Sequence, residues 1–372
     1  MSQDRGHTVS CVVVNYFCSQ LTLAAVQSFA AQCPKGQVIV VDNSADPQEL
    51  EALSAGLPAG CVLIPQKENT GFAVACNVAA ARCDRDFILL LNPDALLLSD
   101  CVSQLVSSLQ QRPDLAAVSP VQFWDRAQEW MLPPAWLPTG LGHWALTVAS
   151  QSHRSAHRLS MAYRRLALQV WSAPPQAVVE QRALSGGAML LRRSAVNSLP
   201  NLFDPAFFMY YEDSDLCLRL KRLGWKLAMV RSAQAIHEWE HSDSKFQMME
   251  RSRSHYFSSN FTGRGLWEQR LAKASLTSSL DNPLQAQPLA RGTTVIAVPR
   301  SWQENWLLEV SPSPLLTPAL GCLGSGPVAG LDWSLMNRLG DHARFFVRLS
   351  PCDKSISETQ TFVVSASVAP VH

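Results

Sequence analysis

The first 120 residues alternate short apolar runs with longer stretches in which apolar residues recur every three or four positions. β-Branched apolar runs favour strands, and the three-to-four spacing favours helices. The predicted strands are Val9 to Val14, Gln37 to Val41, Cys61 to Ile64, Phe87 to Leu91 and Ala116 to Ser119. The predicted helices are Ser19 to Gln32, Pro47 to Ala55, Gly71 to Cys83 and Ser99 to Arg112. This alternation predicts an α/β fold with a mostly parallel central sheet.

Polar residues stand just past the ends of three of these strands. Asn15 follows the first strand, Asp42 and Asn43 follow the second, and Asn92 and Asp94 follow the fourth. In open α/β sheets, ligands bind in the crevice beyond the carboxyl ends of the strands. The pattern therefore predicts a ligand site at this edge of the sheet.

The composition changes between about residues 121 and 180, which hold five of the eleven tryptophans. These are Trp124, Trp130, Trp136, Trp144 and Trp171. We interpret the stretch as an insertion, either an acceptor-facing lobe or a membrane-surface patch. The alternative is a small helical subdomain whose core the tryptophans fill.

The sheet pattern resumes at residues 183–192, and a further strand is predicted at 225–230, after an aromatic and acidic loop. From about residue 290, short alternating segments separated by Pro and Gly predict a small β-rich C-terminal module. The predicted domains are 1–265, which carries the insertion, and a C-terminal extension at 266–372.

Charge and composition narrow the function classes. The 31 basic and 30 acidic side chains give a net charge of +1, without the basic excess of a nucleic-acid binder. A hydrophobic content of 47% argues against a disordered chain. The sequence opens without a signal-peptide layout, and no apolar run reaches the ~18 residues that span a bilayer. We expect a cytoplasmic protein, with peripheral attachment at the inner face of the cytoplasmic membrane left open.

Two positions are candidates for metal or phosphate chemistry. Asp94 ends an Asn-Pro-Asp triplet behind a buried strand, where with a diphosphate it would share a hard cation such as Mg²⁺ or Mn²⁺. The triplet alone is equally consistent with a turn. His237 follows the strand predicted at 225–230, and it would ligate a metal, donate to phosphate or have a structural role.

The densest cluster of carboxylates is Glu212, Asp213 and Asp215, which follow four aromatic residues and a methionine. Apolar neighbours and mutual repulsion raise carboxyl pKa values, which is a way to tune a general base. Glu212 and Asp213 are therefore candidates for that role. Asp215 fits a structural position in the first turn of a helix, with Arg219 four residues on as its partner.

Two glycine-containing segments are candidates for close contact between backbone and ligand. One is Asn69 to Phe72, where Gly71 stands at a strand-to-helix turn and Asn77 follows in the helix. The other contains Gly186 and Gly187, which alternatively mark a bulge. The chain lacks the spaced glycines of dinucleotide-binding and P-loop proteins.

The order of these segments is more specific than any one of them. Together they resemble glycosyltransferase family 2, especially its rhamnosyltransferase-like bacterial branch, over about residues 9–260. The matching segments are Val12 to Tyr16, Val41 to Ser44, Asn69 to Asn77, Leu91 to Asp94, Gly186 to Ala188 and Phe203 to Leu216.

The resemblance implies a GT-A fold and an inverting single displacement. The donor would be a dTDP-, UDP- or GDP-linked sugar, with a deoxyhexose such as rhamnose as the transferred group. The acceptor would be a hydroxyl of a bacterial surface glycan or of a lipid-linked precursor. The donor-binding residues implied by the resemblance are Asn15, Asp42, Asn43, Asn69, Gly71, Phe72, Asn77, Asn92, Gly186 and Gly187.

The resemblance also assigns the reacting groups. Asp94 corresponds to the metal-binding carboxylate of a D-x-D motif whose first position is Asn92 here. His237 corresponds to a histidine near the diphosphate, although Ser242 follows one residue later than the family spacing. Glu212 and Asp213 correspond to the catalytic base motif, in which relatives favour the second residue.

Two other functions compete with this interpretation. One is a non-catalytic glycan- or nucleotide-binding protein on the same fold, against which the retention of Glu212, Asp213 and Asp94 argues. The other is a sugar nucleotidyltransferase. That class would need a Gly-rich basic loop near the N-terminus, which residues 15–19 do not provide.

Overall fold

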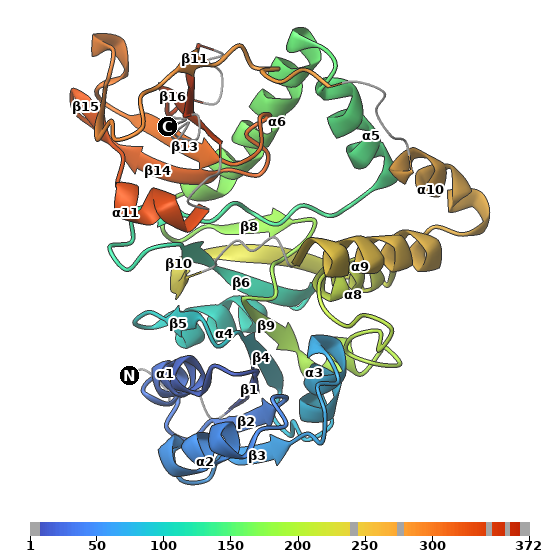
Figure 1. The fold of residues 1–372 in the computed structure, drawn as a ribbon. Helices are drawn as coiled ribbons and strands as arrows, with labels where there is room; N and C mark the ends of the chain where they lie inside the picture. The colour runs from blue at the N-terminus through green and yellow to red at the C-terminus, as the bar shows by residue number, and fades with distance from the viewer. Residues whose placement is uncertain (1–7, 239–244, 274–278, 340–343, 354–357, 365–372) are drawn as a thin grey trace, which may run out of the picture.

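The structure is a computed structural model that describes residues 8–238, 245–273, 279–339, 344–353 and 358–364 of the 372-residue chain. Strands and helices alternate through the N-terminal half, as predicted (Figure 1). Its strands are β1 (Val9–Asn15), β2 (Gln37–Asp42), β3 (Val62–Pro65), β4 (Phe87–Leu91), β5 (Ala95–Leu97) and β6 (Leu115–Phe123). Its helices are α1 (Ser19–Ala30), α2 (Pro47–Gly56), α3 (Phe72–Ala80) and α4 (Cys101–Gln111).

The central sheet has the strand order β3-β2-β1-β4-β9-β6, and β10 (Lys226–His237) lies beside β6. β1 pairs in parallel with β2 and β4, and β6 pairs in parallel with β10. β9 (Ala188–Arg192) runs antiparallel between β4 and β6. The predicted α/β fold with a mostly parallel central sheet is confirmed, with β9 as the antiparallel insertion.

Both faces of this sheet are covered, which explains why its strands are apolar throughout. In β4, Ile88 and Leu90 join a core with α3 and with α8 (Glu212–Arg222). Phe87 and Leu89 join a second core with α1 and α4 on the opposite face. Figure 1 shows α1 and α3 on opposite sides of the sheet.

Two strands are longer than predicted. β6 continues through Pro120 to Phe123, because the partner strand β10 has an irregularity between Val230 and Gln234 beside that proline. Proline is tolerated in a sheet where the ladder is already interrupted. β10 continues to His237, seven residues past the predicted end. Residues 121–123 therefore belong to the sheet and not to the insertion.

The tryptophan-rich stretch supplies β7 (Trp130–Met131), α5 (Gly140–Ala149), α6 (His153–Trp171) and β8 (Val178–Gln181). Trp124, Trp130 and Trp171 are buried, but not in the core of a small helical subdomain. Trp124 and Trp130 pack in the core of the C-terminal strands, and Trp171 packs in a core of the central sheet. Trp136 and Trp144 are exposed by 44% and 41%, which leaves them available to a partner or a surface.

The C-terminal half continues with α7 (Arg193–Val196), α8, α9 (Lys245–Asn260) and α10 (Leu266–Ala272), followed by the predicted β-rich region. Its strands are β11 (Gln287–Pro288), β12 (Val295–Ala297), β13 (Trp306–Ser311), β14 (Leu320–Gly324), β15 (Val328–Gly330), β16 (Phe345–Pro351) and β17 (Gln360–Val364). β7 pairs with β6 on one side and β14 on the other. In the described residues, most C-terminal strands therefore extend the central sheet, and only β12 and β15 form a separate pair.

A buried ion pair joins β13 to β16, and two further hydrogen bonds from buried arginines join these strands to α6. The Arg348 guanidinium donates to both Glu309 carboxylate oxygens at 2.6 and 2.7 Å, and each side chain is only 2% exposed. Arg348 also donates to Ser160 Oγ at 2.6 Å. Arg164, which is fully buried one helical turn away, donates to Ser350 Oγ at 3.0 Å. α6 and the C-terminal strands are thus joined by charge-assisted hydrogen bonds.

In the described part of the chain, no helix combines the length and the apolarity that crossing a membrane requires.

Candidate active site

Asn15 and Asp42 lie at the carboxyl ends of β1 and β2, and the parallel register pairs them directly. Asn15 Nδ2 donates to Asp42 Oδ1 at 3.0 Å and to Glu49 Oε2 at 2.9 Å. The Asn15 side chain is fully buried, so its amide orients Asp42 and α2 instead of facing a ligand crevice. The N-cap of α2 is Asp46, whose carboxylate accepts from the N–H groups of Gln48 and Glu49, so Asp42 does not cap this helix.

The second part of the site is the loop before α3. Asn43 Nδ2 donates to Asn69 Oδ1 at 2.8 Å, and Asn43 Oδ1 accepts from the Thr70 N–H at 3.0 Å. Gly71 has φ +83°, and a Cβ there would lie 2.6 Å from the Phe208 carbonyl oxygen. The Phe72 N–H donates to that same oxygen at 2.7 Å. Gly71 therefore lets the Asn69–Phe72 loop contact the aromatic and acidic loop directly.

Asn77 holds the start of that aromatic and acidic loop. Its Nδ2 donates to the Phe203 carbonyl at 2.8 Å, and its Oδ1 accepts from the Phe203 N–H at 2.9 Å. Both polar atoms of the Asn77 amide are thus hydrogen-bonded to the backbone of Phe203, so Asn77 positions the start of the loop.

Strained backbone precedes the two candidate bases. Tyr210 and Tyr211 both have left-handed backbone, with φ of 70° and 68°, and Glu212 and Asp213 then open α8. Consecutive non-glycine residues in this region cost about 1–3 kcal/mol each and persist only where surrounding contacts hold them. Such strain is concentrated at functional sites.

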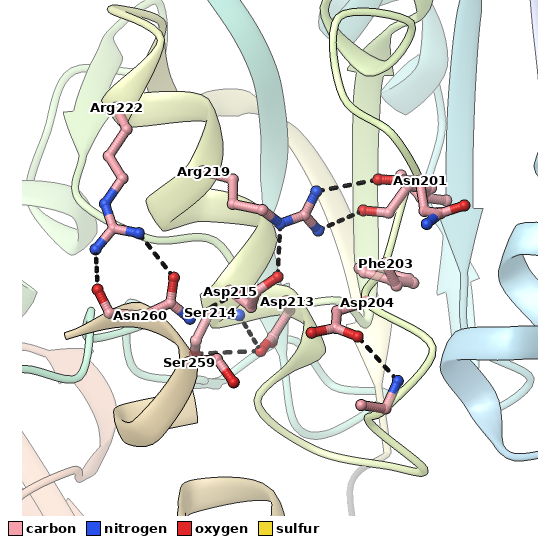
Figure 2. A network of polar contacts seen from close by, with 12 residues as sticks. Asn201, Phe203, Asp204, Asp213, Ser214, Asp215, Arg219, Arg222, Ser259 and Asn260 are labelled. Carbon is pink, nitrogen blue, oxygen red and sulfur yellow. Dashed lines mark hydrogen bonds and ion pairs between the residues drawn. The ribbon is translucent and has the colours of Figure 1, made fainter. Parts of the chain in front are cut away.

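A network of polar contacts holds the first turns of α8 (Figure 2). Arg219 Nε lies 2.6 Å from Asp215 Oδ2, and the same guanidinium donates to the carbonyls of Asn201 and Leu202. Asp215 Oδ1 also accepts from Asn260 Nδ2 at 2.7 Å. The predicted pairing of Asp215 with Arg219 is confirmed, and Asp215 is a structural residue.

Asp213 and Glu212 have different surroundings. Asp213 is half-buried and accepts hydrogen bonds from the Ser214 N–H at 2.6 Å and the Gly186 N–H at 3.3 Å. Burial raises the pKa of Asp213, and these hydrogen bonds partly offset the rise. Glu212 is 7% exposed, and its Oε2 has no hydrogen-bond partner among the described residues. Burial and the repulsion of Asp213 raise the pKa of Glu212 to about 8, so it holds a proton at neutral pH.

The raised pKa of Glu212 predicts a loss of folding stability as pH rises. The folded chain keeps this proton up to about pH 8, whereas an unfolded chain releases it near 4.5. Between these values the folded state binds more protons, so the free energy of unfolding falls with pH. Urea unfolding at pH 5 and pH 8 should show this fall, and Glu212→Gln should reduce it. An identical pH dependence in both proteins would contradict the assignment.

Asp94 and His237 are brought together by the pairing of β5 with β10, in which His237 stands opposite Ala95. His237 Nε2 lies 3.3 Å from Asp94 Oδ1, and His237 Nδ1 lies 2.8 Å from Gln122 Oε1. A Cβ at Gly187 would collide with the His237 ring, so only glycine allows the ring to sit there. The Asn92 N–H donates to the Gly187 carbonyl at 2.9 Å, which fixes the Asn-Pro-Asp turn beside both residues.

This pair fits a divalent cation. His237 Nε2 is buried, has no hydrogen-bond partner in the described residues and lies beside the Asp94 carboxylate. An imidazole nitrogen and a carboxylate oxygen are both ligands of divalent cations, so the two side chains fit one. The described residues form no cluster of three or more His, Cys, Asp or Glu ligands, so diphosphate or water oxygens would complete the coordination. Ser242 lies outside the described residues.

A continuous series of contacts joins these groups along one edge of the sheet. Asn43 contacts the Asn69–Phe72 loop, which contacts Phe208. Asp213 contacts Gly186, whose neighbour Gly187 packs on His237. Sequence reasoning missed Gln122, because it lies in the part of β6 assigned to the insertion and no motif marks it.

The family comparison agrees with this arrangement. The family model described as "Glycosyltransferase like family 2" matches residues 2–256. The chain therefore belongs to this family and is a glycosyltransferase. The GT-A fold expected from the resemblance is confirmed by the family match together with the mixed, mainly parallel sheet.

Two relatives point to the rhamnosyltransferase-like branch. The N-acetylglucosaminyl-diphospho-decaprenol L-rhamnosyltransferase of Mycobacterium tuberculosis strain H37Rv is 26% identical over 220 residues, which are 56% of this chain and 68% of the relative. Rhamnosyltransferase WbbL of Escherichia coli K12 is 44% identical over 62 residues, 17% of this chain and 23% of WbbL. Mannosyltransferase PcManGT of Pyrobaculum calidifontis, solved with GDP-Man and Mn²⁺, aligns with a TM-score of 0.46 and 16% identity, covering 71% of this chain and 68% of PcManGT.

Proposed function

We propose that the chain is an inverting glycosyltransferase that transfers a deoxyhexose, such as rhamnose, from a nucleoside-diphosphate donor. The acceptor we propose is a hydroxyl of a bacterial surface glycan or of its lipid-linked precursor. The observation that carries the proposal is the placement of Asp213 on Gly186, next to Gly187 and the His237–Asp94 pair. In the proposal, Asp213 is the base and the His237–Asp94 pair faces the diphosphate, one on either side of this short glycine segment. The named activities of the two relatives support rhamnose as the sugar.

We propose that the nucleoside lies across the ends of β1 and β2. Asp42 and Asn43 would contact it, and the Asn69–Phe72 loop would border it. Asn15 and Asn77 act through these neighbours, because their amides are occupied by Asp42 and Phe203. Asn92, Gly186 and Gly187 would approach the diphosphate sugar with their backbone.

In the proposed reaction, the acceptor oxygen attacks the anomeric carbon from the face opposite the diphosphate. The new carbon–oxygen bond forms as the bond to the diphosphate oxygen breaks, and the hydroxyl proton passes to Asp213. Hydrogen bonds from Ser214 and Gly186 favour the ionised form of Asp213, while Glu212 stays neutral beside it. A divalent cation held by Asp94 and His237 would neutralise the charge on the departing diphosphate.

A screen of nucleotide sugars tests this proposal. Thermal unfolding and hydrolysis are measured with dTDP-, UDP- and GDP-sugars, with and without Mg²⁺ or Mn²⁺. One donor should raise the unfolding temperature and be slowly hydrolysed, because a ligand that binds only the folded state stabilises it. Asp94→Asn should weaken cation-dependent donor binding at least about 10-fold.

Asp84→Asn is the matched control, since Asp84 is an exposed carboxylate paired with Arg85 on the surface. The proposal fails if no donor is hydrolysed or stabilises the fold. Donor binding without hydrolysis or transfer would instead favour the non-catalytic binding protein.

We also propose peripheral membrane contact through an apolar patch formed by exposed Leu141 and Trp144 of α5 and Leu266 and Trp267 of α10. The two helices lie side by side, and the Leu141 N–H of α5 donates to Glu268 Oε2 of α10 at 3.0 Å (Figure 1). Exposed tryptophan and leucine on short helices partition into the lipid interface.

Replacing both tryptophans of this patch, Trp144→Ala with Trp267→Ala, should lower co-sedimentation with phosphatidylglycerol-containing vesicles at least about 10-fold, since each buries a large apolar side chain in lipid. The control is Val295→Ala with Val328→Ala, which removes equally exposed apolar groups from the separate β12–β15 pair. Equal sedimentation of the tryptophan variant and the unaltered protein would contradict the proposed contact.

A further inference from the structure

A cavity of about 300 Å³ lies where the catalytic half of the sheet meets the C-terminal strands. Gln122, Ser185 and His237 belong to its lining and lie close together, because Gln122 Oε1 contacts His237 Nδ1, and the Gly187 N–H beside that ring donates to Ser185 Oγ. We call these three residues its polar end. Val310, Ala319 and Leu320, from β13, β14 and the loop before β14, belong to the lining that the C-terminal strands contribute. The cavity therefore exists only because the C-terminal strands pack against the glycosyltransferase fold.

The polar end of this cavity adjoins two groups of the proposed reaction centre. Ser185 immediately precedes Gly186, whose N–H contacts Asp213, and His237 is the proposed partner of Asp94. Along the sheet, the proposed nucleoside site lies at β1 and β2, whereas the cavity lies at β6 and β10 and beside β14, on the other side of β4 and β9. A molecule that reaches Asp213 from the cavity is therefore the acceptor and not the nucleotide.

The lining decides the chemistry of the occupant. Among the described residues it contains no Trp, Tyr or Phe, no carboxylate and no guanidinium. Beyond the polar end it consists mainly of aliphatic side chains and prolines, with three serines, Ser119, Ser311 and Ser313. A sugar ring buried there would leave most of its hydroxyls without partners, at a cost of several kcal/mol by general transfer energies, whereas an aliphatic group would lose nothing. Because a cavity of about 150 Å³ holds a benzene ring, this one has room for about ten carbon atoms.

We propose that this cavity is an acceptor subsite that takes an aliphatic group carried by the acceptor, and that the C-terminal strands serve to select such acceptors. The inference rests on the proposed glycosyltransferase function and names the acceptor class. The sugar-bearing hydroxyl then lies at the polar end near Asp213, and the aliphatic group extends past Ser185 toward Ala319.

Binding of an alkyl glycoside series to the full chain tests the proposal. Methyl to dodecyl β-D-glucosides, kept below their micelle concentrations, displace the fluorescent apolar probe N-phenyl-1-naphthylamine. Affinity should rise about threefold to fourfold per added methylene and level off near ten carbons, where the cavity is full. Affinity that does not depend on chain length, or that rises without levelling off, would overturn the proposal.

Two variants fill the cavity from different segments of its lining. Ala135→Phe lies in the half-buried loop before α5, and Ala319→Phe lies before β14. Each should weaken octyl glucoside binding at least about tenfold. Ala290→Phe is the matched control, an exposed alanine of the C-terminal region outside the cavity, and should bind like the unaltered chain. Thermal unfolding of each variant reports whether it folds.

Donor hydrolysis, measured in the same proteins, separates this inference from the proposed function. We expect the filled variants to lose alkyl binding and to keep hydrolysis. If both filled variants fold and bind octyl glucoside like the unaltered chain, the subsite assignment is wrong even though the transferase remains. If the unaltered chain hydrolyses no donor, the proposed function fails, whatever the alkyl series shows.

Discussion

Asp213→Asn is expected to lower sugar transfer about 10²- to 10⁴-fold, the usual contribution of a general base. The asparagine keeps the shape of the side chain, but it has one acceptor oxygen where Asp213 uses two. It therefore keeps only one of the hydrogen bonds from Ser214 and Gly186, and it cannot take the acceptor proton. In the proposed site the donor contacts Asp42, Asn43 and the Asp94 region, so the affinity for the donor should remain within about twofold. The expected signature is a loss of kcat without a loss of donor affinity.

Single-turnover kinetics and donor titration measure the two quantities separately. Glu212→Gln is the discriminating variant, because a neutral amide resembles the protonated carboxyl that Glu212 has at neutral pH. Its transfer rate should fall less than about tenfold. If Glu212→Gln loses as much activity as Asp213→Asn, or if Asp213→Asn keeps most of its activity, the base is not Asp213.

Glu309→Gln is expected to destabilise the fold by about 3–5 kcal/mol, the usual cost of removing one partner of a buried ion pair. Arg348 would keep its charge in a site that is 2% exposed, while the new amide offers one neutral acceptor oxygen in place of two charged ones. Ser160 and the Met161 sulfur are its other side-chain partners among the described residues. Urea unfolding measures the change. The double variant Glu309→Leu with Arg348→Met removes both charges and should recover most of the loss.

Arg126→Ala is the control for a surface pair, since Arg126 is 69% exposed where it meets Glu238. Its loss should cost less than about 1 kcal/mol. A change below that value in Glu309→Gln would mean that the buried pair between β13 and β16 does not stabilise the fold.

Much of the N-terminal fold could be predicted because its signals are local. β4 has the predicted bounds, and the apolar runs of β1 and β2 differ from the prediction by one residue at the end. The ends of β6 and β10 were missed for a long-range reason. Proline usually ends a strand, and Pro120 fits within β6 only because the partner strand β10 is irregular beside it.

The sequence predicted which residues are candidates for the site, but not which of them contact one another. Asp94 and His237 were separate candidates, and a three-residue strand, β5, brings them together by pairing with β10. Such a short strand has almost no sequence signal of its own. Gln122 has no sequence signal at all, because its role depends only on the contact of its side chain with the His237 ring. Asn15 and Asn77 were expected at the donor, and the hydrogen bonds of their amides to other protein groups are the basis of the positioning role proposed for them.

The two-residue strand β7 has a consequence for how this chain can be divided. The family match ends at residue 256, whereas the hydrogen-bond ladder of the sheet passes through β7 into β14 and onward. The residues that match the family model and the residues joined in one hydrogen-bonded sheet therefore end at different places. A fragment cut at the family boundary would expose an unpaired strand edge together with Trp124 and Trp130, which the C-terminal strands now cover. The boundary of the family match therefore cuts through one sheet and one apolar core.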